Sequence, residues 1–217
     1  MIGRSVIGRS AIVAAIAVTI TVSVFGTVRW KALRSTTAAG FWYAEGSVVL
    51  PAHAAARLGG PLTPAEIASI ERISRAELRK AFAGLRIAFT DRRDAFWRVE
   101  VVNDLGRRGP IRLPRAGESV ILGPLGGVAA VNFNLIALKA IEYAPRGASR
   151  DTVVEAIARG VGRVAAHEIA HQIVGAGAMH DDGDDHSYEF PSPDRASQYY
   201  GELHWTIAWP MLQQKIG

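Results

Sequence analysis

The sequence predicts an α+β fold in which an N-terminal transmembrane helix precedes a domain with a mixed β-sheet, an active-site helix and a C-terminal helix. Three observations predict this fold. Residues 11–28 form an uncharged apolar run, two later segments repeat apolar residues at helical spacing, and four short segments between those two have the composition of strands.

The composition is that of a globular chain whose positive charge is concentrated at one end. Of its 217 residues, 49% are apolar and 21% are charged, which is enough for one buried core. The first 34 residues contain five basic residues and no acidic one, whereas the remainder carries 20 basic and 20 acidic residues. No RNA-binding pattern accompanies the basic residues, so no nucleic-acid partner is expected. Because cysteine is absent, a metal site would have to use histidine and carboxylate ligands.

The apolar run at residues 11–28, AIVAAIAVTITVSVFGTV, predicts a single-pass membrane anchor. As a helix, its 18 residues would span about 27 Å, close to the thickness of a bilayer core. An alternative is export followed by removal of a signal peptide. Basic residues flank both ends of the run, so the side of the membrane stays undetermined. The expected organisation is an anchor or signal segment at 1–34, a linker at 35–62 and a domain at 63–217.

Helices and strands of the domain are predicted from periodicity and turn residues. Thr63, Pro64 and Glu66 form a capping box at the start of a helix that ends near Gly84. Strands are expected at 85–90 and 95–102, joined as a hairpin, and at 119–122 and 128–135. A second long helix is expected at 151–174 and a C-terminal helix at 195–216.

The helix at 151–174 ends in a motif that indicates a metal site. Its apolar stripe continues directly into Glu168 and His171, and burying these polar side chains without partners would cost several kcal/mol. His167 and His171 are four residues apart and therefore lie on one helical face, with Glu168 beside them. This is the H-E-x-x-H pattern, in which two imidazoles bind zinc and the glutamate takes a proton from a zinc-bound water.

A catalytic zinc site usually has three protein ligands and one open position. His180 is the preferred third ligand, because the glycine-containing turn after the helix could bring it back toward His167 and His171. His186, Asp181 and Glu189 are the alternatives. The acidic run that follows His180 could equally be a solvated loop.

HEIAHQIVGAGAMH followed by SYEFP resembles the active-site region of the metzincin metalloproteases, and the match covers residues 165–191. The resemblance implies a zincin-like domain at 63–217, zinc bound by His167, His171 and His180, and Glu168 as the general base. Two features depart from the metzincin motif. The third histidine comes three residues late, and Glu189 stands where the methionine of the Met-turn is expected.

The predicted function is that of a membrane-anchored zinc metallopeptidase that hydrolyses peptide bonds. Tyr188 could stabilise the oxyanion, although a packing role is an alternative. Residues 126–134 could be an edge strand that pairs with an extended peptide substrate, or a plain central strand. The other function classes are a zinc hydrolase acting on a non-protein amide and a membrane-tethered binding module with a vestigial metal site.

Overall fold

The computed structural model describes residues 36–106, 115–122, 126–175 and 179–217. Residues 37–217 form one compact unit. Along the chain, its elements are β1 (Thr37–Tyr43), α2 (Ala52–Leu58), α3 (Pro64–Ala81), β2 (Ile87–Thr90), β3 (Trp97–Val102), β4 (Gly117–Ile121), β5 (Gly127–Asn132), α4 (Phe133–Glu142), α5 (Arg150–Val174), α6 (Ser197–Tyr200) and α7 (Ala208–Ile216).

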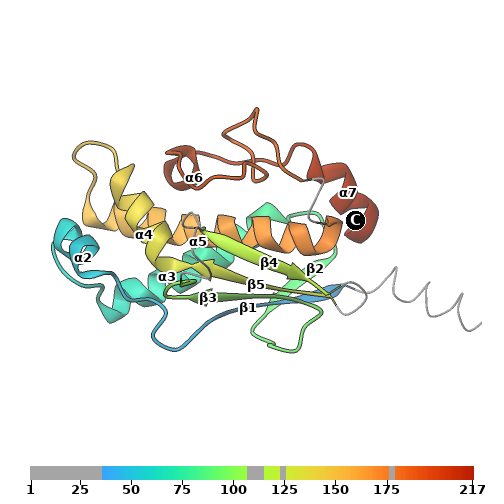
Figure 1. The fold of residues 1–217 in the computed structure, drawn as a ribbon, viewed down its shortest axis with the longest axis horizontal. Coiled ribbons are helices and arrows are strands. Elements are labelled where there is room, and N and C mark those ends of the chain that lie inside the picture. Colours follow the sequence, from blue (N-terminus) through green and yellow to red (C-terminus); the bar gives the residue numbers. More distant parts are fainter. Residues whose placement is uncertain (1–35, 107–114, 123–125, 176–178) are drawn as a thin grey trace, which may run out of the picture. The chain divides into compact units, whose positions relative to one another are not determined.

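The sheet has the order β2-β1-β3-β5-β4 and is mixed, as the sequence predicts. Its first four strands are parallel, and β4 pairs antiparallel with β5 at one edge. Figure 1 shows α3, α4 and α5 together on one face of the sheet. Alternate residues of β3 are buried under these helices, among them Val99 and Val101, which are fully covered.

Helix α3 begins as its capping box predicts. The Thr63 hydroxyl accepts a hydrogen bond from the Glu66 amide, and the Glu66 carboxylate accepts one from the Thr63 amide. Arg150, at the start of α5, donates to both carboxylate oxygens of Glu66 at 2.6 and 3.0 Å. The two long helices are therefore joined at their N-terminal ends.

The predicted hairpin between residues 85–90 and 95–102 is wrong. Strands β2 and β3 do not pair with each other, because β1 lies between them and is parallel to both. The connection between them crosses β1 at Gly40, where an added Cβ would lie 2.1 Å from the Arg92 carbonyl oxygen. A glycine at that position is what allows so short a connection to pass.

Two segments contain helices or strands that the pattern of apolar residues did not predict. The linker expected at 35–62 holds β1 and α2. The strand expected at 128–135 stops at Asn132, whose side chain accepts a hydrogen bond from the Leu135 amide and caps α4. The same segment was also proposed as an edge strand over residues 126–134. It is an internal strand instead, because β5 pairs with β3 on one side and with β4 on the other.

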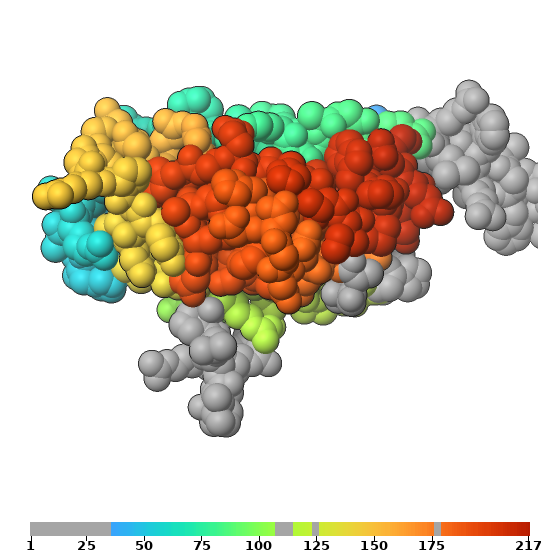
Figure 2. Space-filling model, turned by 90° about the horizontal axis from the view of Figure 1, so that it is seen from above, coloured from blue at the N-terminus to red at the C-terminus, as the bar shows by residue number. Residues whose placement is uncertain are grey.

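The single C-terminal helix expected at 195–216 is also wrong. The chain forms the short α6, passes through an irregular stretch and begins α7 only at Ala208. Trp205 lies in the irregular stretch and packs its ring on Phe82 and Tyr188, with centroid distances of 5.7 and 4.7 Å. Figure 2 shows this C-terminal part, in orange to red, covering the middle of one face of the molecule.

The predicted fold class needs a correction in its membrane part. Within the described ranges, no helix is both long and apolar enough to cross a membrane. The two longest, α3 and α5, carry charged residues along their whole length. The predicted span at residues 11–28 lies outside the described residues. What the structure supports is an α+β fold with a mixed sheet.

Candidate metal centre

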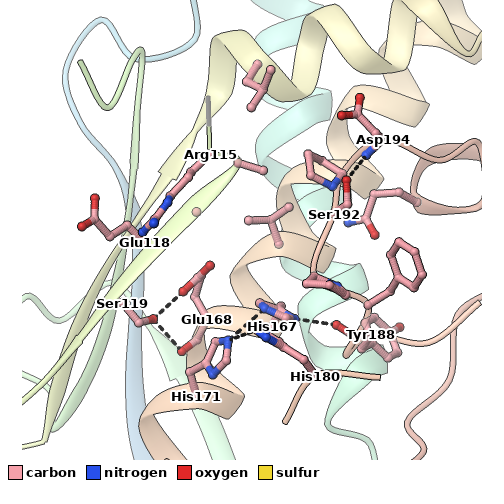
Figure 3. Close-up of a pocket in the computed structure, with 18 of the residues that line it drawn as sticks. Arg115, Glu118, Ser119, His167, Glu168, His171, His180, Tyr188, Ser192 and Asp194 are labelled. Carbon is pink, nitrogen blue, oxygen red and sulfur yellow. Dashed lines mark hydrogen bonds between the residues drawn. The ribbon is translucent and has the colours of Figure 1, made fainter. Parts of the chain in front are cut away.

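Three histidine side chains converge beside the C-terminal end of α5. His167 and His171 project from one face of that helix, and His180 approaches from the segment that follows it (Figure 3). The Nε2 atom of His171 lies 2.9 Å from that of His167 and 3.2 Å from that of His180. The structure thus brings together the three histidines that the sequence analysis selected.

The spacing of these nitrogen atoms fits one tetrahedral ion. Two nitrogens bound to a zinc ion at about 2.0–2.1 Å are roughly 3.3 Å apart, slightly more than the separations seen here. Hydrogen bonding alone does not account for both short contacts, since Nε2 of a neutral imidazole has either one hydrogen or one lone pair, and Nε2 of His171 faces the Nε2 atoms of both His167 and His180. A cation that accepts three lone pairs does account for it.

Two of these histidines, His167 and His171, are held neutral, which is the form that binds metal. Burial, together with the neighbouring His171, lowers the pKa of His167 to about 3. Burial and the nearby His180 lower the pKa of His171 to about 4. The Nδ1–H of His167 donates to the Tyr188 carbonyl oxygen at 2.7 Å, which leaves the Nε2 lone pair directed at the other two rings. Nδ1 of His171 is buried and has no protein partner among the described residues.

Glu168 lies between α5 and the edge strand β4. Its Oε2 accepts a hydrogen bond from the Ser119 hydroxyl at 2.5 Å, and burial raises its pKa to about 7. An added Cβ at Gly117 would lie 2.3 Å from Glu168 Oε1, so only glycine leaves room for the carboxylate at that position. A buried carboxyl group with a pKa near neutrality is suited to taking up and returning a proton.

The alternative third ligands lie elsewhere. Glu189 is fully buried, and its carboxylate accepts hydrogen bonds from the Ser187 hydroxyl and from the backbone amides of Thr206 and Ala208. Asp181 accepts from the Thr206 hydroxyl at 2.9 Å. His186 is exposed and bonds the Glu202 carbonyl oxygen at 3.3 Å. None of the three joins the cluster that His167, His171 and His180 form.

Tyr188 contacts the cluster through its backbone. Its carbonyl oxygen orients His167, while its ring packs on Trp205 and is 4% exposed. Tyr188 is also among the residues that line the cavity beside the histidines, and burial raises the pKa of its hydroxyl to about 12. The oxyanion role stays a prediction.

Sequence reasoning missed two buried arginines that hold the segment carrying His180 and Tyr188. Arg163, one turn before His167 on α5, is 1% exposed and donates to the carbonyl oxygens of Ser197, Gln198 and Gly201. Arg195 donates to the Ser187 carbonyl oxygen at 2.7 Å and to the Asp185 carbonyl oxygen. The signal for Arg163 was present, because a lone charge among Gly160, Gly162 and Val164 needs buried partners.

A cavity of about 730 Å³ opens beside the histidines. Besides the cluster and Glu168, its walls come from β4, from Leu135 and Lys139 of α4, and from residues 190–194. Figure 3 shows Ser119 and Glu118 on one side of this space and Ser192 and Asp194 on the other. This volume is sufficient for a large side chain and adjoining backbone.

Comparisons of the chain with protein-family models, with curated proteins and with solved structures found no match.

Proposed function

We propose that this protein is a zinc-dependent metallopeptidase. The observation that carries the proposal is the convergence of three Nε2 atoms, separated by 2.9 and 3.2 Å along the cluster, next to a buried glutamate and an open cavity. The resemblance of residues 165–191 to the metzincin motif supports the same assignment.

In the proposed reaction, the zinc ion and the side chains of the protein have different roles. A zinc ion held by His167, His171 and His180 would supply Lewis acidity toward the scissile carbonyl. Glu168 accepts a proton from the attacking water, whose oxygen forms a bond to the carbonyl carbon. The same carboxyl group then gives the proton to the amine nitrogen as the C–N bond breaks. The neutral state of His167 and His171 and the buried carboxyl group of Glu168 are consistent with these roles.

The edge strand β4 favours an extended peptide as the substrate. Ala116 and Leu122, at either end of the β4–β5 ladder, hydrogen-bond to Asn132 and Gly126. Because hydrogen-bonded pairs alternate in an antiparallel ladder, the backbone groups of Gly117, Ser119 and Ile121 point away from β5. These groups lie at an edge of the sheet that pairs with no other described strand, and beside Glu168, so a peptide backbone could pair with them.

The test is cleavage of a mixture of unfolded polypeptides, read by mass spectrometry, with the zinc-loaded protein. Glu168→Gln should keep its zinc and lose about 100-fold or more in rate, because the proton acceptor is gone. Glu155→Gln is the matched control on the same helix, where the exposed carboxylate pairs with Arg159, and it should cleave like the wild type.

Two results would contradict the proposal. One is a Glu168→Gln variant that cleaves as fast as the wild type. The other is a zinc-loaded protein that leaves all polypeptides intact but hydrolyses small acyl or formyl amides, which would assign the same site to a non-protein substrate.

A further inference from the structure

Ser119 is placed where it can control the catalytic glutamate. It lies on β4, and its hydroxyl oxygen is 2.5 Å from Oε2 of Glu168 and 3.0 Å from the backbone oxygen of the same residue. Within the described part of the chain, this hydroxyl is the side-chain donor to the Glu168 carboxylate. Figure 3 shows both contacts.

We propose that Ser119 is a positioning residue that holds the Glu168 carboxyl group in place both before and after it takes up the proton. The inference rests on the proposed peptidase function and adds a residue outside the H-E-x-x-H motif to its machinery. Ser119 acts through Glu168 and does not itself touch the reacting atoms.

The argument follows from what a hydroxyl group can do. A serine hydroxyl has one hydrogen to donate and lone pairs to accept with. While Glu168 is a carboxylate, Ser119 donates its hydrogen to Oε2. Once Glu168 carries the proton, it can donate to the Ser119 oxygen, and the serine hydrogen can turn to the Glu168 carbonyl oxygen at 3.0 Å. A hydrogen bond between the two side chains is thus available in either state.

The surroundings give the carboxyl group little freedom beyond this contact. Gly117, two residues before Ser119 on the same strand, lies against Oε1 so closely that an added Cβ would be 2.3 Å away. Glu168 itself is 5% exposed, so the Ser119 hydroxyl provides much of the hydrogen bonding that its carboxylate needs. Without the hydroxyl, a buried carboxyl group would lose its fixed direction relative to the attacking water.

Ser119 also lies between the general base, Glu168, and the strand edge where a peptide substrate would bind. Its backbone N–H and C=O point away from β5, toward the edge where no described strand pairs, while its side chain holds Glu168 on the helix-covered face. A peptide paired with β4 would therefore be placed by the same residue that places the base. When reacting groups are displaced relative to each other, the rate of the chemical step falls more than the affinity for the substrate.

The experiment uses the full-length, zinc-loaded protein and one peptide that it cleaves, and measures kcat and KM for three variants. Ser119→Thr keeps a hydroxyl, Ser119→Val has the same shape as threonine without it, and Ser119→Ala keeps Cβ and removes only the hydroxyl. We expect alanine and valine to lower kcat about 10- to 100-fold with little change in KM or zinc content, and threonine to retain most of kcat.

A double variant separates this inference from the proposed function. In the Glu168→Gln background, Ser119→Ala should cause little further loss, because the group that it positions no longer accepts a proton. Equal kcat for valine and threonine would overturn the role of the hydroxyl and leave the peptidase assignment intact. Full activity in Glu168→Gln would instead overturn the peptidase assignment, and the positioning role with it.

Discussion

Two regions of the molecule contribute to the histidine cluster, and they are stabilised in different ways. The scaffold, meaning the sheet with α3, α4 and α5, supplies His167, Glu168, His171 and Ser119 and is held by buried apolar side chains. The closing segment, residues 179–207, supplies His180 and the Tyr188 carbonyl and has little regular structure. Three buried charged side chains, Arg163, Arg195 and Glu189, hold it through hydrogen bonds to backbone.

The difference shows where each half of the site is vulnerable. Packing in the scaffold is spread over many apolar contacts, so that a single change removes a small part of it. In the closing segment, one guanidinium or carboxylate satisfies several backbone groups at once. Loss of one such side chain leaves buried polar groups unpaired, and each of these carries a desolvation cost.

The largest effect is expected for Arg163→Met. Methionine fills a similar volume but leaves the Glu77 carboxylate and three carbonyl oxygens without their donor. Removal of one partner from a buried ion pair costs about 3–5 kcal/mol, which urea unfolding would measure. Arg159→Met is the control one turn earlier on α5, where the more exposed Arg159 pairs with Glu155 and reaches Glu77 only at 4.0 Å, and it should cost less than about 1 kcal/mol. A loss in Arg163→Met as small as that expected for Arg159→Met would show that the closing segment does not depend on Arg163.

A smaller loss is expected for Glu189→Gln. The amide keeps the shape but removes the charge that the amides of Thr206 and Ala208 and the Ser187 hydroxyl face. Hydrogen bonds to charged groups contribute about 1.5–3 kcal/mol, so the free energy of unfolding should fall by roughly that amount. Glu202→Gln is the control, because Glu202 lies in the closing segment but forms an exposed pair with Lys80 of α3. Its free energy of unfolding should change little. A stable Glu189→Gln variant would mean that α7 does not need the carboxylate at its start.

Within the scaffold, Gly162→Ala should destabilise the protein although alanine favours helices. An added Cβ at Gly162 would lie 2.5 Å from the Ser74 carbonyl oxygen, which is backbone of α3 and cannot turn aside. We expect a loss of about 1–3 kcal/mol in thermal or urea unfolding. At Gly160 the three nearest atoms to an added Cβ belong to the side chains of Ile136 and Tyr199 and lie 2.8 to 2.9 Å away, so the same change should cost less. The reverse order would show that α3 and α5 are not in such close contact.

The smallest effect concerns the joint between α3 and α5, and it depends on pH. Hydrogen bonds from Arg150 lower the pKa of Glu66 from 4.5 to about 2. A group whose pKa is lower in the folded state stabilises the fold above the unfolded pKa and loses this contribution as the pH falls. Glu66→Gln should therefore cost about 1 kcal/mol at pH 7 and almost nothing near pH 2. A cost that is the same at both pH values would exclude the charge as its origin.

The sequence predicts the scaffold better than the closing segment, because periodic apolar residues report on local structure. Helix α5 and the capping box of α3 follow from spacing alone, and they place His167, Glu168 and His171 correctly on one helix. The β2–β3 hairpin was wrong because β1, with the sequence TAAGFWY, has too little alternation to be recognised as the strand that separates them.

The closing segment could not be predicted, since its contacts join distant residues. Glu189 caps the start of α7 through Thr206 and Ala208, which are 17 and 19 residues away, and this contact breaks the predicted C-terminal helix. Ser119 lies 49 residues before Glu168 and belongs to no motif. His180 was selected from a turn signal, whereas the geometry that completes the cluster depends on these long-range hydrogen bonds.

The measurement that tests the central claim most directly is the zinc content of the purified protein and of four variants, by elemental analysis after dialysis. We predict close to one zinc per chain in the wild type and in His186→Ala, and loss of zinc in His167→Ala, His171→Ala and His180→Ala. His186 is the control because it lies outside the cluster on the same segment as His180. Zinc retained by His180→Ala, or a wild type that binds none after reconstitution, would contradict the three-histidine centre.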